Sequence, residues 1–151
     1  MRLGALPLAA AALAVAPLLP ATPPPLDVHL RAATGSLPKG VSRSPDGRTL
    51  YVTAYGNVNG DNVDVFDADT LRRRAVIHLP GVAVESAVSP DGATLYVSDF
   101  RRGSVYFVDT RTRRVRREAR VGAHPKILAV TADGARVFAA NWGGRSVTEL
   151  D

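Results

Sequence analysis

SPDGRTLYVT, residues 44–53, is the stretch that decides the fold, because it recurs in related form twice further along the chain. SPDGATLYVS occupies residues 89–98 and TADGARVFAA residues 131–140, so the steps are 45 and 42 residues. The proline, aspartate and glycine suit a tight turn: proline presets φ, aspartate bonds to nearby backbone and glycine adopts a positive φ. The apolar and aromatic residues that follow are typical of a strand. The repeat therefore predicts three copies of one turn-and-strand unit.

Each unit contains further strand-like runs. One run ends in aspartate at a spacing of 42 residues: Val63–Asp67, Val105–Asp109 and Val147–Asp151. In the middle unit we expect four strands, at Ala83–Ser89, Thr94–Ser98, Ser104–Asp109 and Arg114–Val121. A four-stranded antiparallel unit of about 40–45 residues is the size of a β-propeller blade. The predicted fold is therefore all-β, with blades at residues 37–82, 83–123 and 124–151.

The strand after each turn resembles a known repeat. Tyr51-Val52-Thr53, Tyr96-Val97-Ser98 and Phe138-Ala139-Ala140-Asn141 are similar to the repeat motif of the YVTN-type β-propellers. Ala54 and Asp99 depart from it, standing where the motif has asparagine. The resemblance covers residues 37–151 and implies a WD40-like propeller, seven-bladed by analogy. The family includes cell-surface and periplasmic repeat proteins and relatives of lactonases and quinoprotein-type redox enzymes, so the resemblance implies a fold and leaves the activity open.

The number of repeats is small for a closed propeller. Residues 37–151 provide about 2.7 units, whereas propellers close with roughly four to eight blades. The chain stops at Asp151, where the third strand of its unit is predicted to end. We therefore expect a truncated part of a longer propeller; the alternative is a short protein that closes by assembling copies. Exposed blade faces would in either case allow self-association.

The composition limits the chemistry. The chain has 151 residues, of which 46% are hydrophobic and 22% charged, which suits a globular domain and not a disordered chain. It has no cysteine, which excludes disulfides, thiolate zinc sites, iron–sulfur clusters and a cysteine nucleophile. We recognise no phosphate-binding glycine loop, nucleophile elbow or His-Glu-x-x-His motif. The sequence therefore predicts no catalytic residue, no metal site and no cofactor.

The N-terminal segment has the pattern of an export signal. Arg2 precedes an apolar run from Leu3 to Leu19 that contains two prolines and is shorter than the roughly 20 residues of a membrane span. We expect a signal peptide at residues 1–21 and a proline-rich linker and lead-in at residues 22–36. The protein would then be periplasmic, cell-surface or secreted, with no transmembrane span once the signal is removed. An uncleaved anchor is the alternative.

Candidate binding residues lie on one face of the predicted propeller. The loops from strand four to the next strand one share this face with the loops from strand two to strand three. A histidine and a lysine at the head of an inner strand suit an anionic ligand, and an imidazole can act as a general base. A loop histidine before a structural proline is the alternative. The only tryptophan would stack on a ligand or pack against the neighbouring blade. The candidates are Lys39, Glu85, His124, Lys126, Asn141 and Trp142, with Tyr55, Arg101, Arg102 and Arg145 on neighbouring loops.

The loop at residues 57–62, NVNGDN, faintly resembles a calcium loop in its alternating oxygen side chains. Its glycine is misplaced and no bidentate glutamate follows at the proper spacing. We therefore favour an ordinary polar loop in which asparagine and glycine supply turns.

The basic run at residues 111–120 predicts either a polyanion site or a solvated edge. The candidate polyanion-binding residues are Arg113, Arg114, Arg116 and Arg117. They fall on an outermost strand, where charges prevent edge-to-edge pairing and arginine stems cover apolar surface. No aromatic residues are interleaved to stack on bases, so nucleic acid is not favoured. The solvated edge is the preferred interpretation.

The sequence therefore favours an exported β-propeller that acts as a binding scaffold for a protein or a small-molecule ligand on its loop face. One alternative is a channel-site enzyme, such as a lactonase-like hydrolase or a quinoprotein- or haem-type oxidoreductase. A polyanion-binding surface protein is the other. Continued repeats beyond Asp151, with a haem-binding motif or a cluster of channel histidines and carboxylates, would favour the enzyme.

Overall fold

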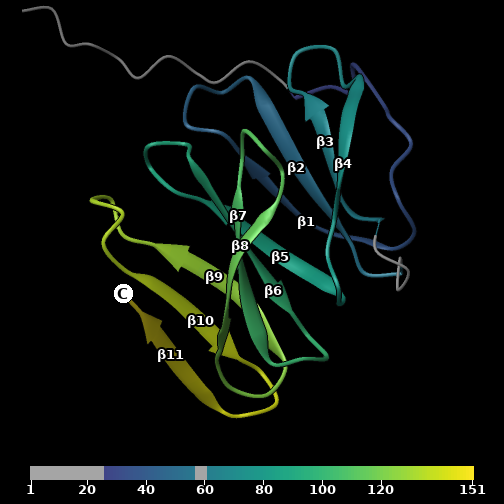
Figure 1. Cartoon of the computed structure of the whole chain (residues 1–151). Helices are drawn as coiled ribbons and strands as arrows, with labels where there is room; N and C mark the ends of the chain where they lie inside the picture. Colours follow the sequence, from purple (N-terminus) through teal and green to yellow (C-terminus); the bar gives the residue numbers. More distant parts are fainter. Residues whose placement is uncertain (1–25, 57–60) are drawn as a thin grey trace, which may run out of the picture.

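The computed structural model describes residues 26–56 and 61–151, which form three separate antiparallel sheets (Figure 1). The first sheet has the order β1-β2-β3-β4, with strands at Pro38–Arg43, Thr49–Ala54, Asp61–Asp67 and Arg73–His78. The second has the order β5-β6-β7-β8, at Ala83–Val88, Thr94–Asp99, Ser104–Asp109 and Val115–Arg120. The third contains β9, β10 and β11, at Pro125–Val130, Val137–Asn141 and Ser146–Leu150. The predicted all-β fold is confirmed, with two four-stranded antiparallel sheets and one of three strands. The strands predicted for the middle unit agree to within one residue at each end.

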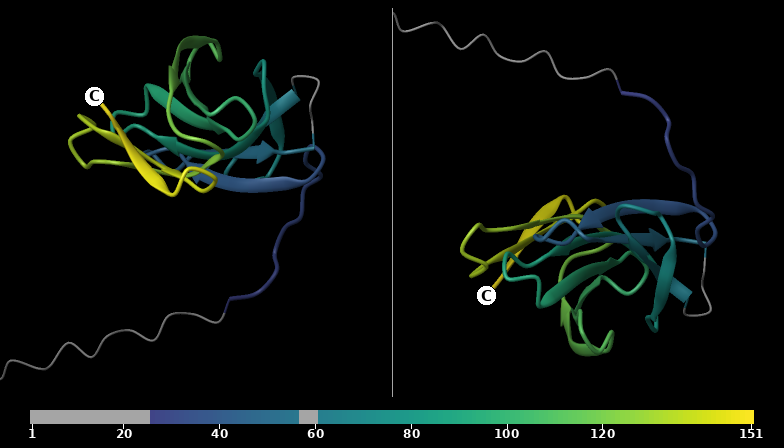
Figure 2. Two further views of the ribbon diagram at one scale, coloured as in Figure 1. Left: turned by 90° about the horizontal axis from the view of Figure 1, so that it is seen from below. Right: turned by 90° about the horizontal axis from the view of Figure 1, so that it is seen from above.

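The first strands of the three sheets lie beside one another, as propeller blades require. β1 packs against β5 and β5 against β9, while the middle sheet lies between the other two (Figure 1). The hydroxyls of Ser42 on β1 and Ser86 on β5 are 2.7 Å apart. Residues 26–34 lead away from the sheets without pairing (Figure 2). The inner strands therefore define one axis, and β4 and β8 lie at the outside.

The core is divided between the two interfaces that separate the sheets. Successive side chains of a strand point to opposite faces, so one strand can serve both interfaces. On β6, Leu95 and Val97 are fully buried in a cluster with Val63 and Ile77 of the first sheet. Tyr96, between them in sequence, packs in the second cluster with Leu128, Val137 and Ala139 of the third sheet. Apolar residues on both faces of the middle sheet are thereby removed from water, which is the main stabilisation available to stacked blades.

The repeated turns have the geometry that their sequence predicts. Gly47, Gly92 and Gly134 all have φ between 73° and 76°, in the left-handed region that favours glycine. In the middle turn, Asp91 accepts the backbone N–H of Ala93, and Ser89 Oγ accepts that of Thr94. These bonds satisfy the turn backbone and fix the register with which β6 pairs to β5.

Candidate functional site

A repeated backbone bond places one aromatic side chain per sheet on the loop face. The residue directly after each second strand donates its N–H to the carbonyl of the residue directly before the first strand of the same sheet. The pairs are Tyr55 to Leu37 at 3.0 Å, Phe100 to Val82 at 3.2 Å, and Trp142 to His124 at 3.1 Å. The two loops of each sheet are thereby joined, and each aromatic ring is held beside the start of an inner strand.

A second repeated bond sets the position of the neighbouring inner strand. The hydroxyl of Thr53 on β2 donates to the carbonyl of Val84 on β5 at 2.7 Å. The equivalent hydroxyl, Ser98 on β6, donates to the carbonyl of Lys126 on β9 at 3.1 Å. Thr53 and Ser98 are the third residues of the repeated Tyr-Val-Thr and Tyr-Val-Ser strands. The motif therefore fixes where the residues at the head of the next blade lie.

These bonds bring together six side chains that we call the aromatic–lysine arc, two from each sheet. They line one open cavity of about 220 Å³: Lys39, Tyr55, Val84, Phe100, Lys126 and Trp142. Lys39, Val84 and Lys126 occupy the same position in the three inner strands, directly after the residues that pair with Ala54, Asp99 and Asn141. The arc thus consists of two repeat positions, one on the inner strand and one directly after the second strand, in each of three successive blades.

The rings of the arc contact one another across blade boundaries. Tyr55 and Phe100 meet edge to face, with centroids 5.9 Å apart. Phe100 and Trp142 are 6.1 Å apart. Lys126 Nζ lies 4.3 Å from the Trp142 centroid, and Lys39 Nζ lies 5.9 Å from that of Tyr55, both within cation–π range. Trp142 lies against Phe100 of the neighbouring blade, and 65% of the Trp142 side chain remains exposed.

His124 adds a further ring beside the arc. Its imidazole stacks on Phe100 with centroids 4.5 Å apart and an angle of 22° between the planes. A Cβ atom at Gly143 would overlap this imidazole, so the absence of a side chain there makes room for the ring. His124 has a φ of 52° and precedes Pro125, as Leu37 with the same φ precedes Pro38. The residue is therefore both a turn element and an exposed partner of the arc.

Glu85 and Asn141, the other candidates from sequence, do not line this cavity. Glu85 lies against β1, because a Cβ atom at Gly40 would overlap its carboxylate. Asn141 is buried, and its Oδ1 accepts the Gly122 N–H at 3.0 Å. Its Nδ2 donates to Ser146 Oγ at 3.1 Å and Thr148 Oγ1 at 2.9 Å. The polar atoms of Asn141 thus hold the loops that carry Trp142.

Sequence reasoning did not identify Phe100 or Val84. The signal for Phe100 was present, because Tyr55, Phe100 and Trp142 each stand four residues after the first aromatic of their repeat. Val84 carries no chemistry of its own and is recognised only through its equivalence to Lys39 and Lys126.

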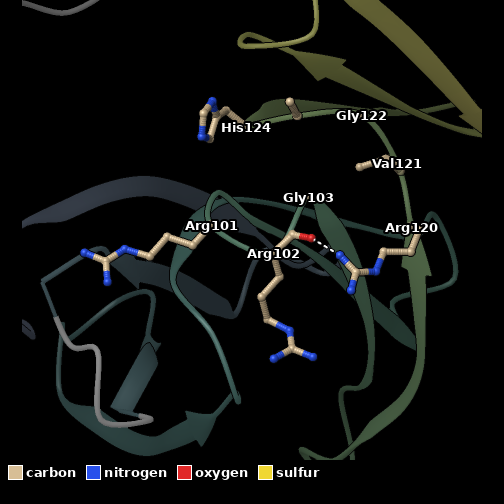
Figure 3. Close-up of a pocket in the computed structure, with 8 residues that line it drawn as sticks. Arg101, Arg102, Gly103, Arg120, Val121, Gly122 and His124 are labelled. Atoms are coloured by element: carbon tan, nitrogen blue, oxygen red, sulfur yellow. Dashed lines mark hydrogen bonds between the residues drawn. The ribbon is translucent and has the colours of Figure 1, made fainter.

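Beside the arc lies a second cavity of about 320 Å³, which arginines line together with the loop before β9 (Figure 3). Arg120 donates to the carbonyl of Arg102, and the Arg102 side chain pairs with Glu118 at 3.3 Å. Figure 3 shows Arg101 and Arg102 extending in different directions, away from Arg120. A hydrogen bond from Ser104, followed by that from Arg102, lowers the pKa of Glu118. Two of the three guanidinium groups are thus already engaged within the loops.

The four arginines proposed for polyanion binding have separate local contacts. Arg113 adopts a left-handed φ of 60° in the turn before β8. The guanidinium of Arg116 pairs with Asp109, and that of Arg117 lies over the Phe107 ring at 4.9 Å. The Arg114 carbonyl accepts the Asp109 N–H at 2.9 Å. Their side chains are exposed along the outer strand and the turn that precedes it.

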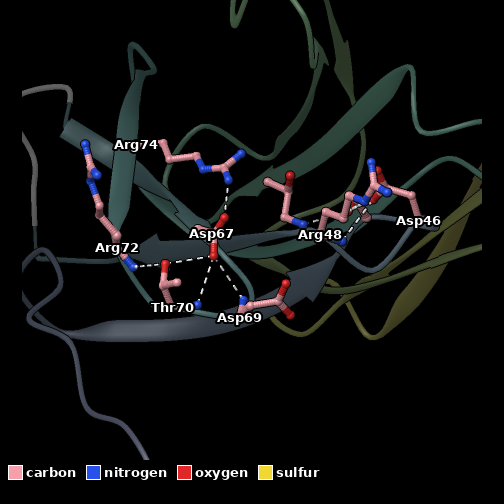
Figure 4. Close-up of polar contacts among 9 residues, drawn as sticks. Asp46, Arg48, Asp67, Asp69, Thr70, Arg72 and Arg74 are labelled. Atoms are coloured by element: carbon pink, nitrogen blue, oxygen red, sulfur yellow. Dashed lines mark hydrogen bonds and ion pairs between the residues drawn. The ribbon is translucent and has the colours of Figure 1, made fainter.

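Aspartates occupy the turns between β1 and β2 and between β3 and β4 (Figure 4). Asp67 accepts the N–H and the hydroxyl of Thr70 at 2.9 and 2.8 Å, and it pairs with Arg74. The hydrogen bonds from Thr70 are the main cause that lowers the pKa of Asp67. Bonds from Ser44, Ser89 and Thr131 lower the pKa of Asp46, Asp91 and Asp133 in the same way. Turn capping accounts for these contacts.

Some expectations fall outside the described residues. The predicted signal peptide lies there, as do residues 57–60 of the polar loop considered for calcium. Among residues 26–56 and 61–151, no group of three histidines, cysteines or carboxylates could hold a metal ion. The same residues include no helical segment that could span a lipid bilayer.

Comparisons with known proteins agree with the arrangement of the sheets. No protein-family model matches the chain. Over 113 residues the chain is 32% identical to a seven-bladed beta-propeller protein of Mycobacterium tuberculosis, a match that covers 73% of this chain and 28% of that protein. Hydrazine synthase of Kuenenia stuttgartiensis has a similar structure, with a TM-score of 0.70, 29% identity and coverage of 82% of this chain and 35% of the synthase chain. The chain thus spans about a third or less of either relative, and its three sheets are β-propeller blades.

Proposed function

We propose that this chain is a binding module that holds a small-molecule ligand or a partner protein on its loop face. The observation that carries the proposal is the aromatic–lysine arc, in which three blades each present a ring at one repeat position. Trp142 is 65% exposed although two of its neighbours are aromatic. Aromatic residues gathered at the surface mark interaction sites more often than isolated apolar residues do.

The position of the arc supports this role. Main-chain hydrogen bonds join the loops of each blade, and hydrogen bonds from Thr53 and Ser98 join neighbouring blades. The backbone that carries the side chains of the arc is therefore held in place. A preorganised surface loses less conformational entropy when a ligand binds. Repeat proteins also use contiguous surfaces built from equivalent positions of successive repeats.

An enzymatic role has weaker support. It rests on the name of hydrazine synthase, of which this chain spans 35%. The imidazole of His124 stacks on Phe100 and in this way adds a further ring to the binding surface. The lactonase-like and quinoprotein- or haem-type alternatives remain proposals that require further residues from other blades.

Two finer proposals accompany this role. Tyr51–Thr53 and Tyr96–Ser98 support a repeat of the YVTN type, since their hydroxyl-bearing third residues tie one blade to the next. Arg2 and the apolar run after it support export. Mass spectrometry of the protein recovered from a secreting host would test export, since retention of residue 1 in the exported form would contradict a cleaved signal.

The test of the binding role uses a library of small-molecule fragments and ligand-observed NMR. Trp142→Ala should abolish the signals of fragments that bind the arc. Val147→Ala is a matched control, because Val147 is similarly exposed, at 68%, and lies on β11 outside the arc. If the two variants kept every fragment bound by the unaltered chain, the arc would not be the contact surface.

A further inference from the structure

The arc has a charge pattern that follows from its repeat positions. Lys39 on β1 and Lys126 on β9 occupy equivalent sites. The buried Val84 occupies the same site on β5, which lies between these two strands. The rings follow the same order, with Phe100 of the middle sheet between Tyr55 and Trp142. The middle of the cavity is therefore apolar, and each side carries an ammonium group.

Neither ammonium group is neutralised by a carboxylate in the part of the chain that the structure describes. Within residues 26–56 and 61–151, Lys39 and Lys126 form no ion pair with a carboxylate. Their close partners are π systems: Tyr55 for Lys39, and Trp142 and Phe100, at 4.3 and 5.9 Å, for Lys126. A ring attracts a cation without cancelling its charge. Two positive charges thus remain available beside an apolar surface, where water screens an incoming anion less than in bulk solution.

The cavity also limits the size of the ligand. Its volume of about 220 Å³ lies below the roughly 300–1,000 Å³ that is usual for drug-sized ligands. A compound of one or two fused rings suits this space. Flat rings gain most from contact with Phe100 and Trp142, because offset and edge contacts between aromatic rings are favourable.

We propose that the aromatic–lysine arc takes a small planar aromatic dianion, with its ring over Val84 and Phe100 and one anionic group directed to each lysine. This inference rests on the proposed function, because it names the ligand class of the same surface. A carboxylate at each end of such a ring can accept a charge-assisted hydrogen bond from an ammonium group.

Three commercial probes separate the contributions of ring and charge. Terephthalate carries two carboxylates on one ring, benzoate carries one, and benzyl alcohol is neutral. Trp142 reports directly on the site, because it is the only tryptophan of the chain. The full chain is titrated with each probe, and binding is measured by Trp142 fluorescence and by calorimetry. Terephthalate should bind most tightly and benzyl alcohol most weakly. Each added carboxylate should tighten binding about tenfold at low salt, and the gain should shrink as ionic strength rises.

Variants assign the gain to the two lysines. Lys39→Met and Lys126→Met keep an unbranched stem and remove the charge, so each should reduce terephthalate binding about tenfold and leave benzyl alcohol binding unchanged. Arg101→Met is the matched control, since it removes one exposed charge from a neighbouring loop that lines the other cavity. Thermal midpoints of all variants show whether each is folded.

The outcomes distinguish the inference from the binding role on which it depends. Equal binding of terephthalate and benzyl alcohol would overturn the inference while leaving the arc as a binding surface. An equal loss of terephthalate binding in Arg101→Met and in the lysine variants would also overturn the inference, because the loss would then reflect the net charge of the protein and not the two lysines. If none of the three probes altered Trp142 or produced heat, the ligand class would be wrong, and the fragment library with Trp142→Ala would decide the binding role separately.

Discussion

The imidazole of His124 stacks on the phenyl ring of Phe100, with centroids 4.5 Å apart, and thereby joins the loop before β9 to the loop after β6. The two residues belong to neighbouring blades and are 24 positions apart in sequence. Phe100 also contacts Tyr55 of the preceding blade. One half-buried ring therefore connects all three blades on the loop face, and its removal is the most direct perturbation of that face.

Phe100→Ala should lower the free energy of unfolding by about 1–3 kcal/mol, through lost burial and lost ring contacts. It should also increase the quenching of Trp142 fluorescence by iodide, since one neighbour that shields the indole is removed. Phe107→Ala is the control, because Phe107 forms an edge contact with Tyr96 at 5.1 Å outside the arc. The control should destabilise the chain without changing the quenching. Equal quenching changes in both variants would contradict the arrangement of the arc.

Asn141→Ala should destabilise the chain by about 1–3 kcal/mol, because a buried side chain with three hydrogen bonds is lost and the Gly122 N–H is left without its acceptor. Asn141→Asp should cost less, because a carboxylate can still accept from that N–H and the hydroxyls of Ser146 and Thr148 can rotate to donate. Asp99 already occupies the equivalent position in the middle blade. Urea unfolding gives both values; a larger loss for Asp than for Ala would show that the amide donor is essential.

Features set by neighbouring residues could be predicted from the sequence, whereas features set by contacts between distant residues could not. The turn at Ser89–Gly92 and the strand at Thr94–Asp99 follow from neighbouring residues, so their prediction was accurate. The partner of Asn141 lies 19 residues away at Gly122, and no local pattern indicates whether a loop asparagine faces a ligand or a distant backbone group. The arc was predictable only in part for the same reason. Lys126 and Trp142 were recognised by residue type, whereas Phe100 and Val84 required the repeat to be aligned position by position.

Stability in acid should depend on the turn hydroxyls. Hydrogen bonds from Ser44, Ser89 and Thr131 hold the pKa of Asp46, Asp91 and Asp133 below their ordinary value of 3.8. A carboxyl whose pKa is depressed in the folded state contributes stability that is present above 3.8 and is lost as pH falls through the folded value. The triple variant with alanine at the three hydroxyl positions should therefore begin acid unfolding at a higher pH. Carboxyl NMR titrations should show the three pKa values returning towards 3.8; unchanged titrations would contradict the hydroxyl as their cause.

Arginines on the outer strand should contribute to packing more than to polyanion binding. Arg117 lies over the Phe107 ring and Arg116 pairs with Asp109, so these two guanidinium groups already have partners at the surface. Arg117→Ser should lower the free energy of unfolding by about 0.5–1 kcal/mol through the lost cation–π contact. Substitution of Arg113, Arg114, Arg116 and Arg117 together by serine should leave the salt dependence of heparin retention nearly unchanged. A marked reduction in its slope would instead show that these four residues displace counterions from a polyanion, as a true binding surface does.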